Sequence, residues 1–482
     1  MHTTVKDADA SARWRFYRTV WRWHFYAGLL VLPLLAWLAL TGAGFVYHRA
    51  LDRAVHHHLL VVAPVAAGRG LPPRQLAAAA QAVLPGPVFR YTTPEAADAS
   101  AQVGIVDAAG KRQVVYLDPA TAQVLGVLPD RGTLGWTLRR LHSLDLVGPW
   151  AGALVEVAAG WAILLVLTGV FLWWPRGAHG GVLRVRGGPR QRVFWRDLHA
   201  VVGVVAGAAV LFLAMSGMPW TWLWGAQVNK WVNGHDFGYP AGVRVQVPMS
   251  QQRLARQVDL PWSLKQARVP QSAAPGDAMA GMHKPSDMAG MDGMPDMPGM
   301  SHGAAHAHAD ALAGQAGAIG LDAAVAAFDR RGIAAGYSID LPSGPRGVYS
   351  ATLYNGVLRQ QRVIHLDQYS GQVLLDMDYA DYGPVAKALE WVINVHLGDE
   401  FGALNRLVLV LACAVVLLLC VSAAVMWWKR RPAGGLGVPP LPPDPRTLRV
   451  VVALLAMGGL LFPLVGVSML LIWGFDRWFV RD

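Results

Sequence analysis

Four histidines occupy equivalent places in two pairs of apolar segments, and imidazole is the side chain most often used to bind a metal or a metal-containing cofactor. His24 and His199 both begin the pattern H-x3-G-x12-(S/T)-G. His142 and His396 both begin the pattern H-x2-D-x2-G-x24-W-W. Because each pattern recurs at identical offsets, the four imidazoles are candidate ligands for a group held between helices.

The segments that carry these histidines are apolar enough to cross a membrane. Hydrophobic residues make up 54% of the 482-residue chain and charged residues only 15%, and a helix needs about 20 apolar residues to cross the bilayer core. The first apolar segment is too long for a removable signal peptide. We predict five membrane spans, at 25–47, 149–174, 199–224, 404–428 and 448–474.

Basic residues set the expected orientation. Arginines and lysines cluster before the first predicted span, between the second and third, and between the fourth and fifth. Short basic segments stay in the cytoplasm, so we expect the stretches 49–141 and 225–395 on the far side, in the periplasm of a bacterium. The net charge of +11 is largely explained by this topology. With no nucleic-acid motif present, no nucleic-acid partner is expected.

The two long stretches outside the predicted spans resemble each other. Residues 114–125 and 363–374 each read as strand, tight turn and strand, because β-branched runs flank Asp118-Pro119 in one and a Leu-Asp pair in the other. Ala-rich segments predicted to be helical precede them, at 72–84 and 321–331. Each half of the chain therefore carries a small α+β domain between two spans.

Several motifs together resemble the PepSY-associated transmembrane family. They are Trp21-Arg22-Trp23-His24, Leu141-His142, the stretch from Thr168 to Arg176, and the two Leu-Asp hairpins, and the resemblance covers most of residues 13–430. Members of this family include iron-regulated membrane proteins and ferric-siderophore reductases of bacterial inner membranes. The resemblance implies b-type haem held between the membrane helices.

The expected fold is a membrane α-helical bundle, built as a tandem TM-PepSY-TM repeat plus a fifth helix, with two small periplasmic α+β PepSY-like domains. The predicted boundaries are 1–48 for the cytoplasmic N-terminus and first span, 49–141 for the first domain, 142–174 for the second span, 175–198 for a basic cytoplasmic loop, 199–224 for the third span, 225–395 for the second domain with an insert at 270–318, 396–428 for the fourth span, 429–447 for a cytoplasmic loop, 448–474 for the fifth span and 475–482 for a periplasmic tail.

Two haems, one for each histidine pair, would suit these residues, because neutral imidazole on both faces of the iron favours electron transfer. His24 and His199 lie at the predicted cytoplasmic mouths, and His142 and His396 lie near the periplasmic side. The outer pair precedes Trp-Trp by 31 residues, about 46 Å of helix, so a break near Gly148 or Gly398 is expected. His48 is the alternative outer ligand.

A segment rich in methionine and histidine interrupts the second domain and is expected to be disordered. Thioether and imidazole ligands favour copper, especially Cu(I), and seven of the 15 methionines fall within 22 residues. The candidate metal ligands are Met279, Met282, His283, Met288, Met291, Met294, Met297, Met300, His302, His306 and His308.

These observations predict an inner-membrane di-haem b oxidoreductase that reduces a periplasmic metal substrate, ferric iron bound to a siderophore or Cu(II). No nicotinamide- or flavin-binding motif is present, so quinol from the lipid bilayer or a separate cytoplasmic donor must supply electrons. Glu156 and Arg406 lie within predicted spans, where ionisable groups are costly, and their role is open. The alternative is a non-enzymatic membrane protein that binds or delivers metal through the Met/His segment.

Overall fold

The chain forms two compact units in a computed structural model. The first comprises Met1–Arg49, Gly135–Lys230 and Val392–Asp482, and the second comprises Ala50–Leu134 and Trp231–Trp391. The residues that the structure describes are 3–66, 69–148, 150–175, 183–232, 237–238, 249–253, 268–272, 318–432, 435–439, 453 and 456–479.

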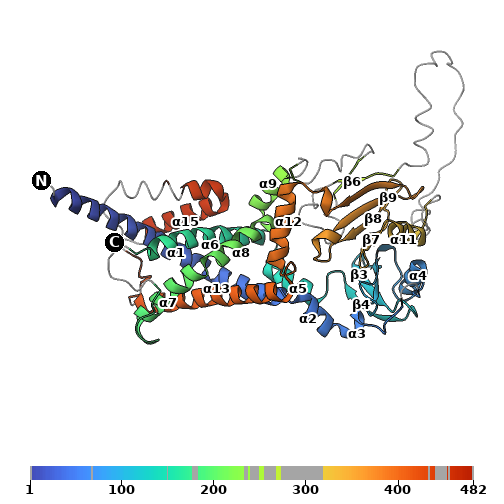
Figure 1. Cartoon of the computed structure of the whole chain (residues 1–482), viewed down its shortest axis with the longest axis horizontal. Coiled ribbons are helices and arrows are strands. Elements are labelled where there is room, and N and C mark those ends of the chain that lie inside the picture. The colour runs from blue at the N-terminus through green and yellow to red at the C-terminus, as the bar shows by residue number, and fades with distance from the viewer. Residues whose placement is uncertain are drawn as a thin grey trace, which may run out of the picture. The chain divides into compact units, whose positions relative to one another are not determined.

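Long apolar helices make up the first unit (Figure 1). Within the described ranges, three helices are long and apolar enough to cross a membrane, and a fourth crossing is possible as a bent pair with an angle of 61°. These are α1 (Thr3–Phe45), α6 (Ala151–Trp173), α13 (Gly402–Arg430), and the pair formed by α7 (Arg192–Val205) with α8 (Gly207–Gly217) and η1 (Met218–Trp220).

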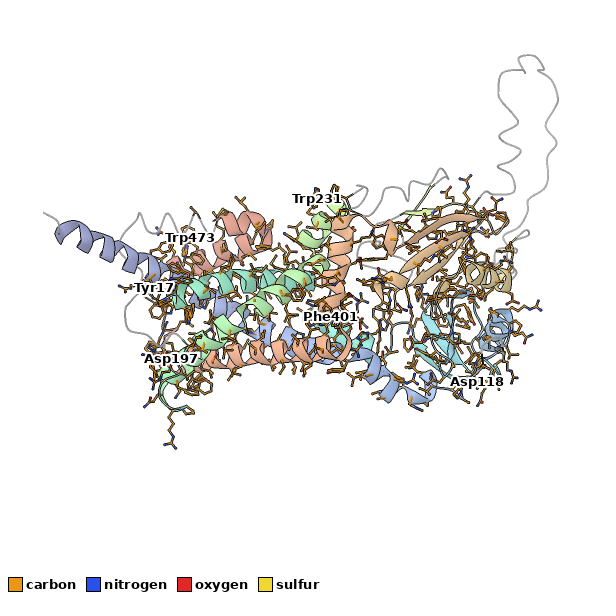
Figure 2. The ribbon with its side chains drawn as sticks, in the orientation of Figure 1. Tyr17, Asp118, Asp197, Trp231, Phe401 and Trp473 are labelled. Atoms are coloured by element: carbon orange, nitrogen blue, oxygen red, sulfur yellow. The ribbon has the colours of Figure 1, made fainter. Side chains whose placement is uncertain are left out.

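Helix α1 packs against α6 and α13, and the bent pair packs against those same two helices. The three long helices and the bent pair, which we call the crossings, therefore form one bundle. Figure 2 shows Tyr17 of α1 and Asp197 of α7 at one end of this bundle and Phe401, next to α13, at the other end.

The C-terminal segment differs from the predicted fifth span at 448–474. Helical residues 456–461 are followed by a bend at Phe462 and by α15 (Pro463–Phe479), which has only 17 residues. A Cβ built on Gly459 would lie 2.8 Å from the Cα of Gly466. Seven residues of straight helix would separate these positions by about 10 Å, so the segment folds back on itself.

The end of α15 consequently lies near the N-terminal half of α1. Asp476 accepts hydrogen bonds from Arg22, at 2.5 Å, and from Tyr26, and Figure 2 shows Trp473 toward the Tyr17 end of the bundle. The sequence predicts a periplasmic tail at 475–482 and a cytoplasmic N-terminal end of the first span. The contact of Asp476 with Arg22, in that first span close to His24, does not agree with a tail on the periplasmic side. Apolarity alone does not distinguish a crossing helix from a hairpin.

An eight-stranded antiparallel sheet organises the second unit. Its strand order is β10-β9-β8-β7-β1-β2-β3-β4. The strands are β1 (Val88–Thr92), β2 (Ala101–Val106), β3 (Arg112–Leu117), β4 (Val124–Pro129), β7 (Ser338–Asp340), β8 (Val348–Leu353), β9 (Arg362–Asp367) and β10 (Val373–Asp378). The expected hairpins are those of β3 with β4 and of β9 with β10.

The first strands of the two similar stretches, β1 and β7, pair with each other, so the two halves share one sheet. Helices α4 (Pro73–Val83) and α11 (Leu321–Arg330) contribute Ala80 and Phe328 to a core formed with the sheet. At the join, Arg90 lies opposite Asp340, and their side chains form a buried ion pair at 3.0 Å. The sequence repeat predicted two similar folds but not their continuous sheet.

The described part of the chain also contains shorter elements. They are α2 (His48–Val55), α3 (His57–Leu60), α5 (Leu134–His142), α9 (Leu223–Val232), α12 (Pro384–Leu397), η4 (Leu358–Gln360), η5 (Tyr379–Asp381) and a two-stranded sheet of β5 (Met249–Arg253) and β6 (Arg268–Pro270).

Candidate functional site

The four repeated histidines form two layers inside the helical unit. His24 and His199 are close enough to interact electrostatically, and so are His142 and His396. His24 lies on α1 and His199 on α7, whereas His142 ends α5 and His396 lies in the last turn of α12. We call these pairs the His24 layer and the His142 layer.

Each histidine of the His24 layer contacts a hydroxyl on a neighbouring membrane helix. Nδ1 of His24 lies 2.8 Å from Oγ1 of Thr168 on α6. Nδ1 of His199 lies 2.9 Å from Oγ of Ser422 on α13. Thr168 and Ser422 occupy equivalent positions, each five residues before a Trp-Trp pair.

The His142 layer repeats this arrangement with hydroxyls from the other two crossings. Nδ1 of His142 lies 3.1 Å from Oγ1 of Thr41 on α1. Nδ1 of His396 lies 2.7 Å from Oγ of Ser216 on α8. All four contacts therefore involve Nδ1, and each joins two elements of the same half of the chain.

The distance between the layers follows from α1, which contributes to both. His24 belongs to one layer, and Thr41, which touches His142, belongs to the other. These residues are 17 positions apart, about 26 Å at the rise of an α-helix. The layers consequently lie near opposite ends of the crossings.

Helix breaks bring His142 and His396 to the ends of the crossings, as the length of these segments predicted. Helix α5 ends at His142 and α6 begins at Ala151. Helix α12 ends at Leu397, and Gly398 has a φ of +83°, a left-handed conformation that favours glycine.

Polar side chains hold the turn that follows His396. The amide of Asn405 donates to the carbonyl of Val395 at 3.0 Å. Arg406 donates to the carbonyl of Gly398 and forms an ion pair with Asp399 at 3.5 Å. Asp399 is the aspartate of the repeated histidine pattern. The charge of Arg406 near the start of α13 therefore has a structural role, as the partner of Asp399.

Glu156, the other ionisable residue in question, is fully buried on α6. Its Oε2 accepts hydrogen bonds from the backbone N–H groups of Leu223, at 2.8 Å, and Trp224, at 3.2 Å. These are the first two residues of α9, whose N–H groups have no partner within that helix. Glu156 therefore anchors the start of α9 to α6.

His48, the alternative outer ligand, has a local environment. Its Nδ1 donates to the carbonyl of Phe45 at 2.8 Å, and its ring stacks on the Phe45 ring with a centroid distance of 4.7 Å. His48 also lies outside the repeat register of the other four histidines, because Leu223 occupies the equivalent position in the second half of the chain. The predicted Met/His ligands, from Met279 to His308, all lie outside the described residues.

Sequence reasoning missed the four hydroxyls as partners of the histidines. Thr168 and Ser422 each follow a repeated histidine by 26 residues, and Thr41 and Ser216 follow one by 17. This repeated spacing was the available signal. Which hydroxyl would meet which ring depends on how the helices pack, and the spacing does not contain that information.

The fold and the site together define a helical membrane protein with a separate β-sheet unit and two layers of paired histidines. Residues 21–430 match the family model of the PepSY-associated TM region. The match covers well over half of the chain, so the protein belongs to the PepSY-associated transmembrane family, as its motifs predicted. No curated protein matches the chain.

Proposed function

We propose that the protein is an inner-membrane oxidoreductase that binds two b-type haems, one in each histidine layer, and passes electrons across the membrane to a metal substrate. The observation that carries this proposal is the pairing of histidines in two layers, each ring held through Nδ1. A ring fixed through Nδ1 can bind metal through Nε2. Two such rings facing one iron suit electron transfer.

The residues around the His24 layer are compatible with a flat macrocycle. Built Cβ atoms on Gly28 and Gly203, one turn after His24 and His199, would meet their nearest neighbours only at 4.0 Å and 3.7 Å. These are ordinary contact distances, so helix packing would accept a Cβ at both positions, and we propose that glycine is present there because it lets the edge of a macrocycle approach the helix. Bound haem supplies reversible one-electron chemistry; the protein supplies the imidazoles, their orientation and an apolar surrounding.

We place the His24 layer on the cytoplasmic side, because the basic segments of the chain flank that end. The sheet unit, with its two PepSY-like halves, then lies in the periplasm. Electrons enter from membrane quinol or from a separate cytoplasmic donor and leave through the His142 layer. One electron converts ferric iron in a siderophore complex to Fe(II), which such a complex holds less tightly.

Reduction can be tested in proteoliposomes that contain a reductant inside and a ferric-siderophore complex outside, with a colorimetric Fe(II) chelator. We expect Fe(II) to form with the natural protein and not with His24→Ala or His396→Ala, while His58→Ala, a change at an exposed histidine, retains activity. Equal rates for all three variants would refute electron transfer through the two layers.

The second candidate function is metal binding or delivery without redox chemistry, favoured by the Met/His segment. It predicts that deletion of 279–308 abolishes copper binding and that no variant shows electron transfer. Replacing the ferric complex with Cu(II) in the same vesicles distinguishes a copper substrate from an iron substrate. If deletion of 279–308 abolishes Cu(II) reduction but not ferric reduction, the segment is a copper-capture site.

A further inference from the structure

We propose that Thr41, Thr168, Ser216 and Ser422 are positioning residues that fix the tautomer of the four histidines, with the proton on Nδ1 and the lone pair on Nε2. The inference rests on the proposed haem ligation and deepens it. It assigns a role to four buried or half-buried hydroxyls in helices that are otherwise almost wholly apolar.

The direction of each hydrogen bond follows from the hydroxyl proton, which is already used. Thr41 donates to the carbonyl of Trp37 at 2.7 Å, and Thr168 donates to that of Leu164 at 2.7 Å. A hydroxyl has one proton and two acceptor lone pairs. The oxygen facing each imidazole can therefore only accept, and Nδ1 must donate.

The second half of the chain gives the same result. Ser216 donates to the carbonyl of Phe212 at 2.5 Å, and Ser422 donates to that of Leu419 at 2.9 Å. Back-bonding to the preceding turn is common for Ser and Thr in membrane helices and would occur without any histidine. The independent observation is that all four hydroxyls also meet an imidazole Nδ1 at 3.1 Å or less.

Small residues beside the hydroxyls fix the position of the rings. A Cβ built on Gly42 would lie 3.0 Å from Cε1 of His142, and one on Gly217 would lie 3.7 Å from Cε1 of His396. Gly169 stands in the same relation to His24, at 3.5 Å. In the fourth case, Ala423 follows Ser422. The rings of His24, His142 and His396 are thus held at Nδ1 by the hydroxyl, and their Cε1 edges face the adjacent glycine.

The hydrogen bonds from Nδ1–H to the hydroxyl and from the hydroxyl to the carbonyl affect the basicity of the imidazole ligand as well as its orientation. Donation from Nδ1 raises the basicity of Nε2, and a more basic ligand stabilises ferric over ferrous iron. Loss of the hydroxyl should therefore raise the midpoint potential of the haem in the affected layer. It should also weaken haem retention, on the order of tenfold for loss of such a partner.

Thr168→Val tests this inference in the full-length protein, because valine keeps the shape of threonine and removes the hydroxyl. We expect the haem of the His24 layer to show a higher midpoint potential and about tenfold weaker retention, with the other haem unchanged. Thr168→Ser should restore both values. Ser468→Ala removes a buried hydroxyl that accepts from Trp161 and should leave both haems unchanged.

Unchanged potential and retention in Thr168→Val would overturn the positioning role while leaving the proposed function intact. Equal changes in Thr168→Val and Thr168→Ser would also overturn it, since the effect would not come from the hydroxyl. A natural protein that binds no haem fails earlier, and that result refutes the proposed function itself. If Thr168→Val does not fold, Ser422→Ala gives the same comparison from the other side of the layer.

Discussion

His365 makes the stability of the sheet unit depend on pH. It lies on β9, fully buried, and its Nδ1 shares a hydrogen bond of 2.8 Å with the hydroxyl of Ser350 on β8. Burial lowers the pKa of His365 from its ordinary value of 6.5 to about 4, because a charged imidazole loses its hydration there. The folded protein therefore keeps this ring neutral at physiological pH.

The sign and size of the effect follow from proton linkage. Between pH 6.5 and about 4 the unfolded chain binds a proton that the folded sheet does not, so stability is complete above 6.5 and is lost as the pH falls. The loss between pH 7 and pH 5 is about 2 kcal/mol, rising to about 3 kcal/mol by pH 4. Burial raises the pKa of the nearby Asp340, and that shift acts in the opposite direction.

Hydrogen exchange of the amides in β8 and β9, measured on the full-length protein in detergent, reports this loss. Comparing His365→Gln with the natural chain at each pH cancels Asp340 and all other groups. We expect protection in the natural chain to fall about 30-fold more than in the variant between pH 7 and pH 5, the equivalent of 2 kcal/mol. His58→Gln, at an exposed position, is the matched control. Equal pH dependence in the natural chain and His365→Gln would refute the argument.

Two further predictions concern the histidine layers and the sheet. Gly42→Ala places a Cβ 3.0 Å from Cε1 of His142, so the ring must shift and haem occupancy of the His142 layer should fall. Gly169→Ala places a Cβ at an ordinary 3.5 Å from Cε1 of His24 and should be tolerated. The haem-to-protein ratio of each purified variant checks this, and equal ratios in the two variants would contradict it. Asp340→Ala removes the closest ion-pair partner of Arg90, a residue that is only 8% exposed. Because the arginine charge then stays buried with its closest partner gone, the variant should lose about 3 kcal/mol of unfolding free energy in a denaturant titration. Replacing both residues with leucine should recover most of that loss, and a single-variant loss below about 1 kcal/mol would indicate that the pair is solvated.

Local patterns in the sequence predicted the parts of the fold that depend on local interactions. Apolar length located α1, α6 and α13, and the turn at Asp118-Pro119 located the hairpin of β3 and β4. The pairing of β1 with β7 was not predictable in this way, because it joins strands about 250 residues apart whose alternation is compatible with several partners. The hairpin before α15 was missed for a related reason, since its close contact of Gly459 with Gly466 depends on packing.

In the candidate site too, the sequence pattern predicts some features, and others depend on helix packing. The four histidines were identifiable because chemistry-bearing residues recur in register, which any alignment of the chain with itself reveals. The pairing of His24 with Thr168, and of His142 with Thr41, depends on contacts between helices. Spacing places the two histidines of each pair at equivalent positions in the two halves of the chain, and the packing of the helices decides which hydroxyl meets which ring.

The most direct test of the central claim is the number of haems per chain in the purified protein, measured by the absorbance of its pyridine complex. Two haems per chain are predicted for the natural protein. His24→Ala and His142→Ala should each remove one, and the double variant should remove both. A natural protein without a Soret band, or full haem content in the double variant, would contradict haem binding by the two histidine layers.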